Sequence, residues 1–148
     1  MSIQEQINID IIKSMKNKEA RKLEALRAAK SAILLECSKD GREKIDDEKA
    51  IKIIAKLVKQ RKDASEIYIS QKRNDLAQIE INQLTFLQTY LPKQIDNKQL
   101  EIIVREVIHE QNASSQKDFG KCISVLIKKL NGQADGKLIS ELLKKELN

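Results

Sequence analysis

Apolar residues recur along this chain every three to four positions, and lysine, glutamate and other polar residues fill the faces between them. This spacing is typical of amphipathic α-helices, in which one stripe faces a core and the rest faces water. No segment alternates apolar and polar residues over the length of a strand. The pattern therefore predicts an all-α protein.

Residues 1–92 contain four such stripes, which predict an N-terminal four-helix bundle. Helix starts are indicated by a capping box at Ser2 and Glu5, by Asp46, and by Asn74 or Asp75. Gly41 is expected to end the second helix in a left-handed turn. The residues expected to face the core are Ile7, Ile11 and Met15; Leu23, Leu26, Ile33, Leu34 and Cys37; Ile51, Ile54, Ala55 and Val58; and Leu76, Ile79, Gln83, Leu87 and Tyr90.

The single proline, Pro92, marks the clearest boundary, because proline lacks an amide hydrogen and disfavours a helical residue before it. We predict a hinge there, with domains at 1–92 and 93–148. The second domain is expected to be a small three-helix bundle, with a capping box at Asp96 and a cap at Ser114 or Ser115. Its predicted apolar stripes are Leu100, Ile103, Val104, Val107 and Ile108; Phe119, Cys122, Ile123, Leu126, Ile127 and Leu130; and Leu138, Leu142 and Leu143.

The segment "NGQADGK", residues 131–137, holds two of the four glycines in the chain. Gly132 fits a left-handed helix end and Asp135 fits the cap of the last helix, with Gly136 in its first turn. These roles explain the glycines as helix punctuation. The alternative is a phosphate seat, since glycine lets a ligand approach the backbone and a helix start favours anions.

Composition excludes several classes of protein. The single histidine, His109, has no catalytic partners, and no nucleotide-binding or metal-binding motif is present, so we expect no catalytic centre, cofactor or metal site. Cys37 and Cys122 are predicted to be buried free thiols. The N-terminus has neither a signal peptide nor a membrane span, which indicates a cytoplasmic protein. The net charge of +6 suits a polyanion such as RNA, or simply a solvated basic surface.

Five phrases occur together in the order and spacing of a known family: "RKDASE", "RNDL", "YLPKQID", "KDFGKCIS" and "NGQADGKLISELL". On these phrases the chain resembles the YqeY-like family over essentially its whole length. That family is similar to the tail domain of the B subunit of the tRNA-dependent amidotransferase. The departures, Phe119 and Cys122, keep an apolar face.

The resemblance implies a non-catalytic helical module that binds tRNA or another structured RNA. Its partners would include an amidotransferase or a synthetase, and any carbon–nitrogen ligase activity would belong to the related full enzyme. The RNA-binding residues carried over by motif are Lys117, Gly120, Lys121, Gly132, Asp135, Gly136 and Lys137. Arg27 and Lys30 are added from the basic stretch 13–30, although Lys30 falls inside an apolar stripe and can equally be a lysine at the edge of the core.

A second interpretation is a protein–protein adaptor that docks on a translation-related partner. It requires an exposed apolar patch, whereas the RNA-binding interpretation requires clustered positive charge. The distribution of apolar and basic side chains over the surface distinguishes the two.

Overall fold

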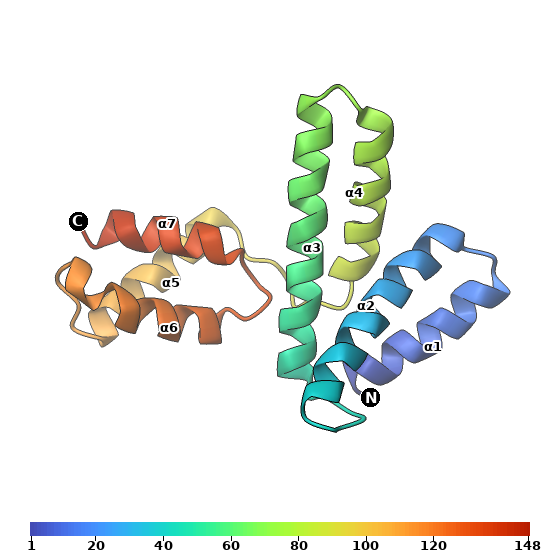
Figure 1. The fold of residues 1–148 in the computed structure, drawn as a ribbon. Helices are drawn as coiled ribbons and strands as arrows, with labels where there is room; N and C mark the ends of the chain where they lie inside the picture. Colours follow the sequence, from blue (N-terminus) through green and yellow to red (C-terminus); the bar gives the residue numbers. More distant parts are fainter. The chain divides into compact units, whose positions relative to one another are not determined.

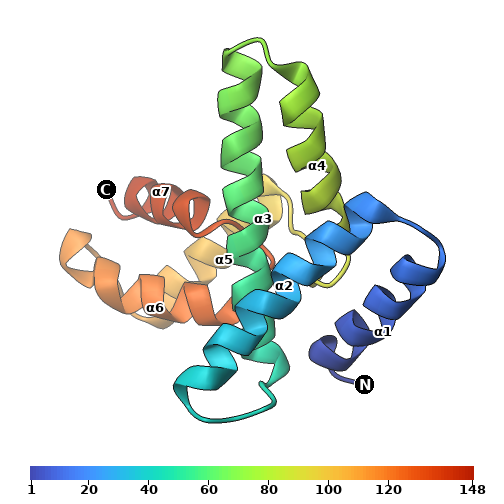
Figure 2. The same cartoon turned by 45° about the vertical axis from the view of Figure 1, so that its right-hand side comes forward.

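The computed structural model describes residues 1–148 and contains seven α-helices, one short 3₁₀ helix and no strand (Figure 1, Figure 2). The all-α prediction is confirmed. The chain divides into two compact units, Met1–Leu91 and Pro92–Asn148. The helices are α1 (Ile3–Lys16), α2 (Ala20–Lys39), α3 (Asp47–Ser70), α4 (Asn74–Gln88), α5 (Asn97–Glu110), η1 (Gln116–Asp118), α6 (Phe119–Lys129) and α7 (Gly136–Glu146).

Side-chain caps begin most of these helices as predicted. Ser2 and Glu5 form the full capping box of α1, and Asp46 accepts the Lys49 amide at 2.9 Å. Asp96 accepts the Gln99 amide at 2.8 Å, so the Asp96 half of the second expected box is formed. These bonds satisfy amides that have no partner within the helix.

The predicted cap of α4 is wrong. Arg73 occupies the cap position without a side-chain hydrogen bond to the helix. Its guanidinium instead binds the Asp75 carboxylate through Nε and Nη2, at 3.2 and 3.1 Å. Asp75 lies in the first turn of α4, where its negative charge interacts favourably with the positive end of the helix dipole. Its carboxylate is directed toward Arg73 and is not the N-cap.

Left-handed residues stand at five inter-helix turns. Gly41 and Gly132 have φ of 64° and 76°, as expected for glycine at a helix end. The other three are Lys18, Lys72 and Asn112. Lysine has no preference for this conformation, so the sequence does not predict it at Lys18 and Lys72. The tight connection between packed helices requires it there.

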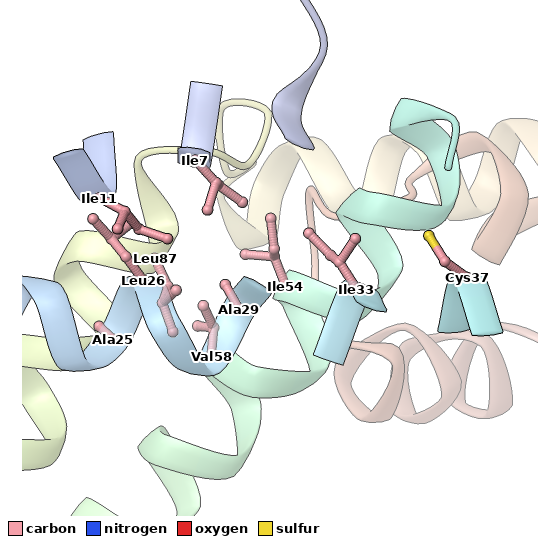
Figure 3. Packing of buried hydrophobic residues seen from close by; sticks show 10 residues of the cluster. All are labelled: Ile7, Ile11, Ala25, Leu26, Ala29, Ile33, Cys37, Ile54, Val58 and Leu87. Atoms are coloured by element: carbon pink, nitrogen blue, oxygen red, sulfur yellow. The ribbon is translucent and has the colours of Figure 1, made fainter. Parts of the chain in front are cut away.

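The N-terminal unit consists of two helical hairpins, α1 with α2 and α3 with α4, and α2 packs against both helices of the second hairpin. Ten buried residues from all four helices form its core (Figure 3). Met15, Leu34 and Ile79 were predicted to face inward, but they are 54%, 48% and 38% exposed. In α1 the buried position of the last turn is Ser14, one residue before Met15.

In the C-terminal unit, α5, α6 and α7 pack against one another around nine buried residues. The 3₁₀ turn at Gln116–Asp118 was not predicted; Ser115 caps it by accepting the Lys117 amide at 3.4 Å. Ile127 was expected inside but is 45% exposed. Cys37 lies in the first core and Cys122 in the second, and both are buried free thiols, as predicted.

Candidate nucleic-acid interface

Helices α6 and α7 form an antiparallel hairpin connected by residues 130–135 (Figure 1). The Gln116 side chain, just before α6, donates to the Lys144 carbonyl at 3.1 Å, near the end of α7. The start of one helix therefore lies beside the end of the other. With 11 residues in α6, the two ends of the hairpin are about 16 Å apart.

This arrangement divides the predicted RNA-binding residues of the C-terminal unit into two sets. The loop end of the hairpin contains Gly132, Asp135, Gly136 and Lys137, and the open end contains Lys117, Gly120 and Lys121. Arg27 and Lys30 lie on α2 in the other unit. The structure thus gathers each set locally but does not bring the seven motif residues to one point.

The loop end is fixed by hydrogen bonds to the segment after Pro92. The Gln94 side-chain amide donates to the Gly132 carbonyl at 2.5 Å, and the Ile95 amide donates to the Gln133 carbonyl at 3.1 Å. Residues 94–95 and 132–133, which are 38 residues apart in the chain, are therefore held together within the C-terminal unit. The contact of Gln94 was not predicted, because it joins residues far apart in the sequence.

At the start of α7, Asp135 is the predicted N-cap, and its carboxylate accepts the Lys137 amide at 3.1 Å. The phosphate-seat hypothesis assumed that the amides at the start of α7 are open to an anion. The Lys137 amide is not, because Asp135 already accepts its hydrogen bond. Gly136 is exposed, and a Cβ built on it would meet no atom within 4 Å. The Lys137 side chain is exposed as well. An anion at this place would contact the Lys137 ammonium and the backbone at Gly136, beside the negative charge of Asp135.

The open end has more internal bonds. The Lys121 ammonium donates to the Gln111 carbonyl at 2.7 Å, so it caps the end of α5. Asp118 accepts the Ser114 amide at 3.0 Å, and this bond lowers the pKa of the carboxyl below its ordinary value. The Lys144 ammonium lies 5.8 Å from the centre of the Phe119 ring, within the range of a cation–π contact. Lys117 and Gly120 are exposed.

Positive charge is concentrated on the hairpin. Between residues 117 and 145 it carries seven lysines and three acids, whereas α5 carries one lysine, one arginine and one histidine against three acids. Two of the three acids on the hairpin accept backbone amides: Asp118 accepts that of Ser114, and Asp135 accepts that of Lys137 as the cap of α7. The seven lysines are Lys117, Lys121, Lys128, Lys129, Lys137, Lys144 and Lys145. Sequence reasoning noted this count but selected only three of them as site residues.

On α2, Arg27 and Lys30 are both exposed. Lys30 lines a small cavity of about 30 Å³ together with Ile7 and Ile33 of the core. Its aliphatic stem therefore lies along apolar side chains while its ammonium reaches solvent, the arrangement of a lysine at the edge of a core. This position gives Lys30 a structural role whether or not it also contacts RNA.

The sequence pattern of the Yqey-like protein family matches residues 4–147. The chain belongs to this family. The family match covers both compact units. A search of curated proteins found no match.

Two general properties of this YqeY-like chain bear on its chemistry. None of its helices combines the length and the apolar character that crossing a membrane requires. No three side chains among histidine, cysteine, aspartate and glutamate lie close enough together to hold a metal ion.

Proposed function

We propose that this chain is a non-catalytic helical module of the cytoplasm that binds structured RNA, with tRNA as its natural target. It would serve glutamyl- or aspartyl-tRNA amidation as an accessory, like the amidotransferase tail that its family resembles. The RNA-binding surface in this proposal is the α6–α7 hairpin, and its main contact is the loop end at Gly136 and Lys137. The hinge at Pro92 would let this surface adjust to the RNA.

The observation that carries the proposal is the position of Lys137. It stands at the second position of α7, where the positive end of the helix dipole disfavours a cation. Its side chain is exposed. Lys128, Lys129, Lys144 and Lys145 are different, because they lie in last turns, where the dipole favours them. Helix stability therefore does not favour a lysine at position 137, and contact with a phosphate would give it a role.

The form of the surface also agrees with duplex recognition. Structured RNA is bound mainly through phosphates and 2′-hydroxyl groups, whereas single strands are bound by stacking on aromatic side chains. Aromatic residues make up only 3% of this chain. Lysines at both ends of the hairpin would meet phosphates at two places, and the fixed loop would hold the backbone of Gly136 close to the RNA.

The test is tRNA binding at several salt concentrations. Lys137→Ala should weaken binding several-fold and lower the slope of log K against log salt by roughly 0.7 to 0.9, the value of one phosphate contact. Lys145→Ala is the matched control, since Lys145 is also exposed on α7 but is favoured by the helix dipole. Its effect on the affinity and slope should be smaller.

Gly136→Ala tests the close approach of RNA to the backbone. The added methyl group meets no atom of the protein, so the folded chain should tolerate it, and any loss of tRNA affinity would come from the RNA side. Gly120→Ala makes the same change in the first turn of α6, where the space is equally open. If wild type, Lys137→Ala and Gly136→Ala share one affinity and one salt slope, the loop is helix punctuation and the proposal is wrong.

A further inference from the structure

A groove of about 550 Å³ lies between α2 and α3, near the loop that joins them. Its volume is within the usual range of binding clefts. The apolar side chains that line it come from both helices: Ala32, Leu35, Ile53 and Leu57. Leu35 is 66% exposed, so most of this side chain contacts solvent rather than the core. Burial of that surface by a partner would be favourable.

Lysines surround this apolar floor: Lys39, Lys49, Lys52 and Lys56. Lys39 is paired with Glu36 at 3.2 Å, and Lys49 lies 3.9 Å from Asp40. Lys52 and Lys56 are exposed. They are four residues apart on one face of α3, where like charges repel and mildly destabilise a helix. A ligand with carboxylates would relieve this repulsion.

We propose that the α2–α3 groove binds an acidic amphipathic helix of a partner protein. The apolar side chains of that helix would lie on Leu35, Ile53 and Leu57, and its flanking carboxylates would pair with Lys52 and Lys56. The lining of α3 extends from Lys49 to Gln60, about 16 Å or three helical turns. This length accommodates anchors spaced i, i+3 or i+4 and i+7, which is how a helix occupies a groove.

The lining favours a protein helix over RNA. No aromatic side chain lines the groove, so it offers no surface on which bases stack. A sugar–phosphate backbone would contact the lysines but leave the aliphatic floor in contact with water. The groove belongs to the N-terminal unit and shares no residue with the α6–α7 hairpin. The inference therefore stands or falls independently of the proposed RNA-binding function.

The experiment uses the full chain and a fluorescein-labelled synthetic peptide of 18 residues, with leucine at helical spacing and glutamate on its flanks. A second peptide has lysine in place of every glutamate. We expect the acidic peptide to bind, with anisotropy giving a Kd at least tenfold lower than that of the basic peptide. In ¹⁵N-labelled protein it should shift the amide signals of α2 and α3 that border the groove.

Three variants complete the test. Lys56→Glu and Leu35→Ser should each weaken binding of the acidic peptide about tenfold, and neither should lower the melting temperature much, because both side chains are exposed. Lys62→Glu makes the same charge change at an exposed site of α3 outside the groove, and should weaken binding less than twofold. Equal binding of the two peptides, or equal effects of Lys56→Glu and Lys62→Glu, would overturn the inference. So would groove amide signals that move with tRNA and not with the acidic peptide.

Discussion

The two units of this chain differ in how they use their apolar residues. The C-terminal unit places nine buried hydrophobic residues at the centre of 57 residues and leaves only Ile102 and Ile127 exposed among its large apolar side chains. The N-terminal unit, with 91 residues, has a core of ten. It exposes eight large apolar side chains: Met1, Ile12, Met15, Leu34, Leu35, Ile67, Ile69 and Ile79.

This difference shows that one helical pattern can produce two kinds of surface. In the C-terminal unit the apolar stripes are largely used up in the core. The feature of its surface that would suit a polyanion is the group of seven lysines on the α6–α7 hairpin. In the N-terminal unit the helices keep apolar residues on their outer faces, which suits association with another protein. The proposed RNA-binding surface and the proposed docking groove therefore lie in different units of the chain.

The largest effect should come from Leu126→Ala in the C-terminal core. Leu126 is fully buried, and such a change costs about 2 to 5 kcal/mol. A 57-residue unit has little stability to lose, so we expect it to unfold while the N-terminal unit remains folded. Amide spectra should lose their dispersion for residues 92–148 and keep it for 1–91.

Ile54→Ala makes the corresponding change in the N-terminal core, because Ile54 is also fully buried, and it should destabilise that unit and leave residues 92–148 folded.

Residues 94–148 alone should remain helical and melt cooperatively. If either core variant unfolds the whole chain at once, or if the fragment is a random coil, the comparison between two independent units and the predicted hinge both fail.

A smaller effect separates the two glycines at the loop end of the hairpin. Gly132 is left-handed, so Gly132→Ala should cost about 1 to 2 kcal/mol. Gly136 is the first residue of α7 with open space around it, so Gly136→Ala should stabilise the unit by up to about 0.5 kcal/mol, less than in a helix interior. Thermal melting of the two variants should therefore shift in opposite directions. A shift of both in the same direction would contradict this assignment of their roles.

The smallest effect concerns the N-terminal unit, where the Tyr90 hydroxyl donates to the Asp10 carboxylate and so links the end of α4 to α1. Tyr90→Phe should cost on the order of 1 kcal/mol. Burial, and then the bond to Asp10, raises the pKa of Tyr90 above its ordinary value. The protonated phenol is therefore the form that the fold favours, and its contribution is complete below about pH 10 and is lost as the pH rises further.

Urea midpoints between pH 8 and pH 11 check this prediction. The midpoint of the wild type should fall more steeply above pH 10 than that of Tyr90→Phe. Parallel curves would show that the bond makes no pH-dependent contribution.

Much of the fold follows from local rules that the sequence displays. A serine or aspartate before an apolar stripe marks a helix start because its side chain satisfies free amides, as at Ser2, Asp46 and Asp135. Glycine after a stripe marks a helix end at Gly41 and Gly132. The failures are positions that tertiary packing decides. Met15 and Leu34 fit the periodicity as well as their buried neighbours do, but no partner helix covers them.

The candidate site was harder to predict than the fold. The motif supplied Lys117, Lys121 and Lys137 as one set, and only the antiparallel hairpin shows that they stand at its two ends. The carbonyl that Lys121 caps belongs to Gln111 of another helix, and the hydrogen bond between Gln94 and Gly132 joins residues far apart in the chain. Sequence spacing within a helix indicates neither contact.

Each unit holds a single cysteine in its core, Cys37 in one and Cys122 in the other. Figure 3 shows the Cys37 sulfur at one end of the N-terminal cluster. Because both thiols are shielded from solvent, a thiol reagent can modify either one only when the surrounding helices open. The two native cysteines can therefore report local unfolding of the two units. The rates at which the two sulfurs are labelled would measure the opening of each unit separately, without any engineered probe.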